Sequence, residues 1–126
     1  MTLLAKRQER SIVPRMYYIT TAIDYTNGPP HIGHAYEKVL ADVLARWHRM
    51  KGEEVYFLTG VDQHGQKVQQ TAEKLGITPQ EHVNNITEQF LALWNRLGIS
   101  NDGWASTTDP RHKACVQKIL TDLKDK

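Results

Sequence analysis

The sequence predicts an α/β fold that begins with a β–α–β unit, and three observations support this prediction. Residues 16–22 are rich in aromatic and β-branched side chains and are followed by an Asn-Gly-Pro-Pro turn, which is typical of a buried strand. Residues 32–50 carry apolar side chains at helical spacing. Residues 55–59 form a short continuous apolar run, typical of a parallel strand that is buried on both faces.

The helix over residues 32–50 is predicted to pack its apolar stripe against the sheet and to end at Gly52. The stripe consists of Tyr36, Val39, Leu40, Val43, Leu44, Trp47 and Met50. The polar residues Glu37, Asp42, Arg46 and Arg49 are expected on the opposite side.

Three further helices are predicted after residue 59. The first is short, contains Val68 and Ala72, and ends at Gly76. The second starts at the capping box Thr78-Pro79-Gln80-Glu81 and ends at Gly98. After an irregular stretch around Trp104, Asp109-Pro110 starts the last helix. Its inner face is expected to hold His112, Val116, Ile119, Leu120 and Leu123.

Length and composition bound the class of protein. The 126 residues can form one domain, predicted over 16–126, with residues 1–15 as a flexible N-terminal extension. A formal net charge of +2 permits a nucleic-acid partner without requiring one. Cys115 is the only cysteine, so the chain has no internal disulfide and no cysteine-based zinc site. No membrane span or secretory signal is expected, and a reducing cytoplasmic setting fits.

The predicted strands are too few for a complete domain. Two parallel strands cannot form a stable sheet that is covered on both faces, because such sheets normally hold several strands between helical layers. We therefore expect the chain to be part of a larger enzyme or one half of an assembly.

The run His31-Ile32-Gly33-His34 lies where the first strand leads into the long helix, and it predicts a phosphate site. A helix N-terminus offers unpaired backbone N–H groups and the positive end of the helix dipole. Gly33 leaves room for a nucleotide close to the backbone. His31 and His34 are three residues apart, so both rings can donate an N–H group to phosphate oxygens. A solvated helix cap is the alternative interpretation of the same histidines.

The segment from Tyr18 to Ile23, with Tyr25, Asn27-Gly28 and the His-Ile-Gly-His run, resembles the first signature of class I aminoacyl-tRNA synthetases, most closely of their methionyl family. Two later stretches are similar to the same family in order and spacing: Phe57-Leu58-Thr59-Gly60 followed by Asp62, His64 and Gly65, and then Thr107-Thr108 with Arg111-His112-Lys113. The resemblance implies a Rossmann-like catalytic core, here incomplete, with the first β–α–β unit and the helices that follow.

The resemblance also implies an activity and a set of site residues. The family activates methionine with ATP and Mg²⁺, releases pyrophosphate and passes the methionyl group to tRNA. By position, His31 and His34 are the catalytic residues and bind ATP together with Gly33 and Glu37. Ile23, Tyr25 and Asp62 bind methionine, with Asp62 accepting the α-ammonium group. Asp62 as a turn cap and Tyr25 as plain core remain the structural alternatives.

The sequence also departs from the family pattern. Asp24 stands where the family more often has an aromatic residue or proline, and Val61 and Gln63 stand where threonine and glutamate are commoner. No Lys-Met-Ser-Lys-Ser loop is present. We therefore expect this chain to be weakly active or inactive alone, with the missing C-terminal part of the enzyme as a partner.

Three alternative functions remain open. A metal-dependent hydrolase could use His31, His34, Asp62 and His64 as ligands. A non-catalytic module could keep the nucleotide cradle without turnover. A small nucleotidyltransferase could share the His-x-Gly-His turn, although the later stretches do not fit that class.

Overall fold

Strand β3 (Val55–Asp62) is the centre of the sheet in the computed structural model, which describes residues 16–125. The predicted extension over residues 1–15 lies outside the described residues. Strands β1 (Tyr17–Thr20), β2 (Asp24–Tyr25) and β4 (Gly103–Ser106) all pair with β3 in parallel. β1 pairs with the first half of β3 and β2 with its end, while β4 pairs opposite Leu58 to Val61. β1 and β2 therefore share one edge of β3, and β4 occupies the other.

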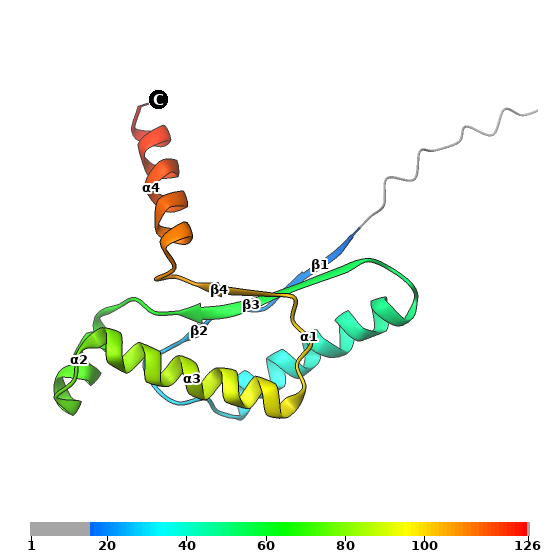
Figure 1. Ribbon diagram of the computed structural model, residues 1–126, viewed down its shortest axis with the longest axis horizontal. Helices are drawn as coiled ribbons and strands as arrows, with labels where there is room; N and C mark the ends of the chain where they lie inside the picture. The colour runs from blue at the N-terminus through cyan, green and yellow to red at the C-terminus, as the bar shows by residue number, and fades with distance from the viewer. Residues whose placement is uncertain (1–15, 126) are drawn as a thin grey trace, which may run out of the picture.

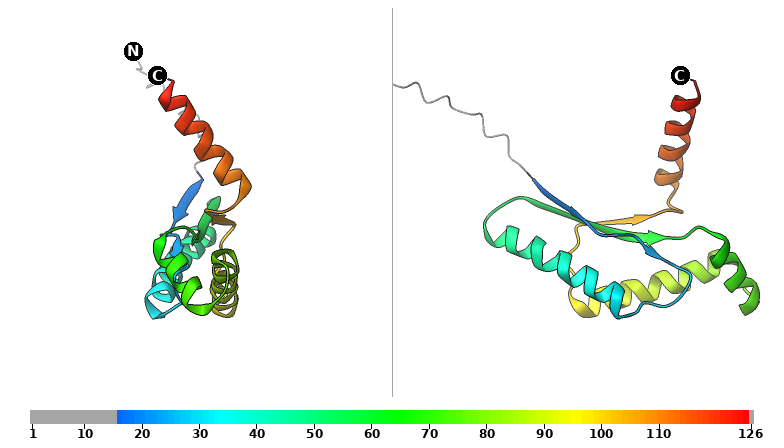
Figure 2. Two further views of the ribbon diagram at one scale, coloured as in Figure 1. Left: turned by 90° about the vertical axis from the view of Figure 1, so that its left-hand side faces the viewer. Right: turned by 180° about the vertical axis from the view of Figure 1, so that it is seen from behind.

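Helices α1 (Ile32–Met50) and α3 (Pro79–Leu97) lie side by side on one face of this sheet (Figures 1 and 2). Helix α2 (Gln66–Leu75) follows the carboxyl end of β3 and packs against α3. Helix α4 (Pro110–Lys124) projects from the sheet on the opposite side (Figure 1). The predicted α/β class with a parallel sheet is confirmed.

The core lies between the sheet and the two long helices. Phe57 and Val61 of β3 are fully buried. Phe57 packs with Ala41 and Ala45 of α1, and Val61 packs with a cluster on α3. The α3 members of that cluster are Ile86, Phe90 and Trp94. Burying these side chains supplies the main favourable contribution to folding, at about 25 cal/mol per Å² of apolar surface.

The expectation that β3 is buried on both faces is wrong for the described residues. Successive side chains of a strand point to opposite faces, so Tyr56 lies on the face opposite Phe57. There it stacks on Tyr18 of β1 with ring centroids 5.8 Å apart. Tyr18 is 57% exposed and Tyr56 is 37% exposed. The sheet is thus covered by α1 and α3 on one face only.

The predicted inner stripe of α1 is also wrong. The buried residues of α1 are Lys38, Ala41, Asp42 and Ala45. The two alanines let the helix approach Phe57 closely, and Asp42 accepts hydrogen bonds from the backbone N–H and hydroxyl of Ser100. The longer apolar side chains are therefore exposed, namely Tyr36, Val39, Leu40, Val43, Leu44, Trp47 and Met50.

Local signals placed the helix ends correctly. Gly76 and Gly98 end α2 and α3 in the left-handed conformation, with φ of 69° and 65°. The Thr78 hydroxyl accepts the Glu81 N–H at the start of α3. Asp109 caps α4 in the same way through the Arg111 N–H.

Two other predictions need correction. The stretch around Trp104, expected to be irregular, is strand β4, whose side chains are only partly buried. The predicted inner face of α4 is exposed, because no residue of that helix is buried against the described part of the chain. Among the described residues no helix is both long and apolar enough to span a membrane.

We predict that Gly60→Ala lowers the free energy of unfolding by about 2 kcal/mol or more, because a Cβ atom at this position would overlap the Ala105 carbonyl group of β4. Urea denaturation followed by tryptophan fluorescence measures this. Gly28→Ala is the matched control, since a Cβ at Gly28 meets no atom within 4 Å. Equal denaturation midpoints for the two variants would show that β4 does not pack this closely on β3.

Candidate active site

The candidate site lies at the carboxyl edge of the sheet, where open parallel sheets bind ligands. β2 brings its residues next to the end of β3, with Tyr25 paired to Asp62. The chain then runs from Tyr25 to the start of α1 at Ile32. The sequence-predicted residues of the site therefore come from three elements that meet at one edge.

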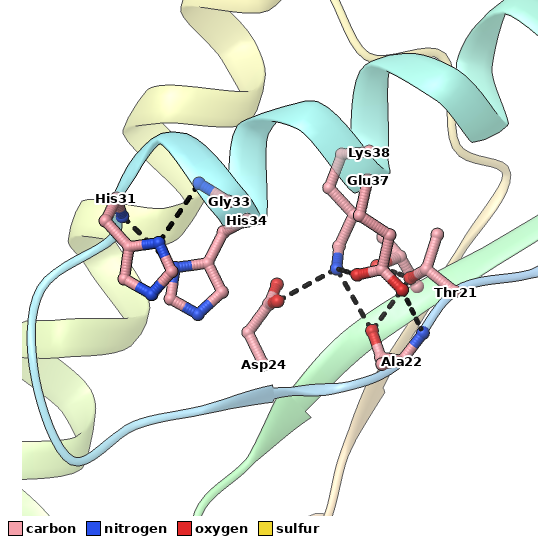
Figure 3. Close-up of polar contacts among 9 residues, drawn as sticks. Thr21, Ala22, Asp24, His31, Gly33, His34, Glu37 and Lys38 are labelled. Atoms are coloured by element: carbon pink, nitrogen blue, oxygen red, sulfur yellow. Dashed lines mark hydrogen bonds and ion pairs between the residues drawn. The ribbon is translucent and has the colours of Figure 1, made fainter.

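His31 and His34 form a reciprocal cap at the start of α1 (Figure 3). The Nδ1 atom of His31 accepts the Gly33 N–H at 3.1 Å, and the Nδ1 atom of His34 accepts the His31 N–H at 3.1 Å. The ring centroids lie 3.7 Å apart. Because both Nδ1 atoms act as acceptors, each neutral ring carries its proton on Nε2. The pair can thus cap the helix and still donate two Nε2–H groups to a ligand.

The surroundings of His34 favour its neutral form. Its ring edge packs on Phe90 of α3, with the centroids 5.0 Å apart and the planes at 82°. Partial burial lowers the pKa of His34, the charges of His31 and Lys38 lower it further, and the Asp24 carboxylate opposes them. The first turn of α1 carries no acidic side chain, so the positive end of the helix dipole is left for an anion.

The structure gives a local reason for glycine at position 33. A Cβ atom there would lie 2.9 Å from the Cε1 atom of His31. The missing side chain therefore lets the His31 ring fold back over the first turn of α1. The predicted role of Gly33 in nucleotide approach remains a prediction.

Of the three predicted methionine residues, Tyr25 and Asp62 are paired at the ends of β2 and β3, and Ile23 directly precedes β2. Asp62 is partly buried, and its Oδ1 accepts the His64 N–H at 3.3 Å and the Thr107 hydroxyl at 3.4 Å. The Tyr25 hydroxyl lies against Gly65, where a Cβ atom would overlap it. Ile23 is 41% exposed. Asp62 does cap the turn after its strand, and the residue is only partly buried.

Sequence reasoning missed the importance of Lys38 and Asp24. The Lys38 ammonium group is fully buried and donates to Asp24 Oδ1 at 2.9 Å, to the Ala22 carbonyl at 3.0 Å and to Glu37 Oε2 at 2.9 Å (Figure 3). Glu37 Oε1 accepts the Ala22 N–H at 3.1 Å. A signal was present: Lys38 precedes Ala41 and Ala45 by three and seven residues, the spacing of one helix face.

The pKa values of the two carboxyl groups in this cluster are shifted in opposite directions. Burial raises the pKa of Asp24, against the lowering effect of Lys38. Burial also opposes ionisation of Glu37, but the hydrogen bonds from Lys38 and the Ala22 N–H lower its pKa below the ordinary value. The Glu37 side chain stays 41% exposed.

The residues proposed as ligands for a hydrolase metal do not form a metal site. Within residues 16–125, no three His, Cys, Asp or Glu side chains are grouped so that they could hold an ion. His64 instead contacts the Thr107 carbonyl through Nε2 at 3.1 Å.

Residues 17–126 match the family model described as tRNA synthetases class I (M). The chain is 50% identical to a methionine–tRNA ligase of Streptomyces coelicolor over 113 residues, which is 89% of this chain and 21% of that protein. It is 50% identical to the Deinococcus radiodurans ligase over 88% of this chain and 16% of that protein. A solved Mycobacterium tuberculosis methionyl-tRNA synthetase in complex with methionyl-adenylate has a TM-score of 0.76 and 42% identity, covering 78% of this chain and 19% of that chain.

We predict that His31 and His34 both carry the Nε2–H tautomer at pH 8, because each Nδ1 accepts a backbone N–H. Long-range ¹H–¹⁵N correlation spectra at pH 8 distinguish the two ring nitrogens. Exposed His112 serves as the internal reference. A predominant Nδ1–H form at either residue would contradict the capping geometry.

We also predict a pH effect on stability. The folded state lowers the pKa of His34 below 6.5, so the unfolded state binds this proton more readily. The contribution of neutral His34 to stability is complete above about pH 6.5 and is lost as the pH falls through the lowered pKa. His34→Asn retains an acceptor for the cap. This variant should show a smaller change of the urea midpoint with pH between about pH 5 and 7 than the parent chain. His112→Asn should leave the slope unchanged, and equal slopes for all three proteins would refute the effect.

Proposed function

The chain belongs to the class I tRNA synthetase family, and we propose that it forms the ATP- and methionine-binding part of a methionine–tRNA ligase. The observation that carries this proposal is the histidine pair at the start of α1. Both Nδ1 atoms are used within the cap, so both Nε2–H groups can serve phosphate oxygens beside the positive end of the helix dipole. Asp62 and Tyr25 are paired at the neighbouring strand ends.

The proposed reaction begins with attack of the methionine carboxylate on the α-phosphate of ATP. A carboxylate oxygen–phosphorus bond forms, the bond between the α-phosphorus and the bridging oxygen breaks, and pyrophosphate leaves. A tRNA hydroxyl then loses its proton and attacks the methionyl carbonyl carbon, the bond from that carbon to the phosphate oxygen breaks, and AMP leaves. Because the substrate is itself the nucleophile, the protein contributes positioning and stabilisation of charge. ATP enters as its magnesium complex, in which the ion offsets phosphate charge.

His31 and His34 are proposed to donate to phosphate oxygens as charge develops on them. Gly33 is proposed to admit the nucleotide, and Glu37 to lie near the nucleoside. Asp62 is proposed to accept the α-ammonium group of methionine. Its bonds to the His64 N–H and the Thr107 hydroxyl would hold the carboxylate in place for that task.

Ile23 and Tyr25 are proposed to form a wall beside the thioether of methionine. Sulfur packs favourably against aromatic ring edges, which suits a half-buried tyrosine at this place. The Tyr25 hydroxyl rests against Gly65, so the ring is fixed between β2 and the loop that follows Asp62.

Catalysis is proposed to require further polypeptide, because the chain spans 21% of the Streptomyces coelicolor ligase and 16% of the Deinococcus radiodurans ligase. The exposed stripe of α1 and the exposed face of the sheet agree with this, since soluble domains rarely leave large contiguous apolar patches uncovered. We propose that the chain alone is weakly active or inactive. Its partners would be the rest of the enzyme and tRNA, in the cytoplasm.

The test is methionine-dependent exchange between ATP and pyrophosphate. We expect little exchange from the 126-residue chain, and robust exchange from a hybrid in which it replaces the matched segment of the Streptomyces coelicolor ligase. In the hybrid, His34→Ala should reduce kcat by about 100-fold, as expected for loss of one donor to developing charge.

The matched control for this substitution is His48→Gln. His48 lies on the last turn of the same helix, where it stacks on Tyr17, so its loss should leave exchange nearly unchanged. A hybrid that folds but shows no methionine-dependent exchange would overturn the proposed function. Robust exchange by the chain alone would overturn only the proposed need for the remaining part.

A further inference from the structure

We propose that Lys38 is a positioning residue for methionine activation, because its ammonium group fixes the segment over residues 22–25 against helix α1. This inference rests on the proposed function, since that segment carries the proposed pocket residues Ile23 and Tyr25. Lys38 touches neither substrate in this proposal. It acts through the backbone of Ala22 and the side chain of Asp24.

The geometry around Lys38 uses every donor that the side chain has. An ammonium group has three N–H bonds. The Lys38 side chain is 0% exposed, and its three acceptors are Asp24 Oδ1, the Ala22 carbonyl and Glu37 Oε2, all at 2.9–3.0 Å. The ammonium group also lies 5.6 Å from the Trp94 ring centroid. Protein groups thus replace the water shell that the charge loses on burial.

Ala22 lies in the break between β1 and β2, where the chain leaves one strand and enters the next. Its carbonyl accepts from Lys38 and its N–H donates to Glu37, so both of its backbone polar groups are held by neighbouring side chains of α1. Thr26 is fixed independently through the Asp62 carbonyl, which accepts its N–H at 3.0 Å. Ile23, between Ala22 and strand β2, therefore depends on the Lys38 side for its position, whereas Tyr25 is also held by the pairing of β2 with β3.

Asp24 ties the same segment to helix α1. Its Oδ1 is paired with Lys38, whereas its Oδ2 is buried without a hydrogen-bond partner in the described part of the chain. Asp24 lies between Lys38 and His34 (Figure 3). The ion pair thus joins the segment of the proposed methionine wall to α1, about one turn after His34.

Stability alone is a poor explanation for this ion pair. Replacing a buried ion pair by apolar side chains of similar volume is often neutral or stabilising, whereas removing only one partner leaves a buried charge and is strongly destabilising. The two effects can therefore be separated, because a double apolar substitution removes the Lys38 bond to the Ala22 carbonyl while leaving no unpaired charge between positions 24 and 38.

The experiment compares Lys38→Met with Asp24→Val/Lys38→Met in the hybrid ligase. We expect Lys38→Met to lower the denaturation midpoint, and the double variant to regain most of it. In both variants the KM for methionine should rise about tenfold or more, because the pocket wall is displaced. The KM for ATP should change by less than about threefold, since the histidine cap is intact.

Lys51→Met is the matched control, because it removes a partly exposed lysine that follows the same helix. It should leave both KM values unchanged. Recovery of the methionine KM together with stability in the double variant would overturn the proposal, since Lys38 would then act only on stability.

Hydrogen exchange gives a readout that does not require activity. The Ala22 amide is bonded to Glu37, whose other carboxylate oxygen accepts from Lys38. Loss of Lys38 frees this carboxylate, so in the double variant the Ala22 amide should exchange about tenfold faster or more, while the Thr26 amide stays protected in its bond to Asp62. Unchanged protection of Ala22 would overturn the proposal. A parent hybrid that lacks methionine-dependent exchange but shows this Ala22 effect would refute the proposed function and leave the positioning of the segment established.

Discussion

The pairing of strand β3 with all three other strands of the described chain is the constraint on which the site depends. β1 and β2 together make one edge partner, and they leave β3 at different points along its length. The break between them moves the chain toward helix α1, while β2 continues to the end of β3. Ile23 therefore lies in this break, and Tyr25 follows it in β2. The break also leaves the N–H and carbonyl groups of Ala22 to be bound by side chains of α1.

The helix starts and ends could be predicted because their signals are local. A proline after a capping residue or a glycine after an apolar stripe fixes a boundary within a few residues, as at Thr78 and Gly98. The histidine cap was predictable for the same reason. The face that α1 presents to the sheet was not, because it is decided by partners distant in sequence: Lys38 meets Asp24 and Asp42 meets Ser100. Periodicity alone favoured the more apolar stripe, which is exposed.

The exposed face of the sheet has a physical cause in the number of layers. The described residues supply one helical layer, whereas a parallel sheet needs cover on both faces. The core between Phe57, Phe90 and Trp94 is complete on its own side. The candidate site lies on this covered side of the sheet. Phe90 packs against His34, and β2 pairs with β3, so the geometry of the site is defined although the other face of the sheet is uncovered.

The charges near the start of α1 need Lys38 for an electrostatic reason as well. Asp24 and Glu37 place two carboxyl groups beside the turn where an anionic nucleotide is proposed to bind, and like charges oppose one another most strongly away from water. The two histidines cannot offset this while they are neutral. Lys38 bonds to both carboxyl groups from within the protein, where it does not block the helix N-terminus. A cation on the surface would be screened by water and salt, whereas the charge of buried Lys38 is screened much less.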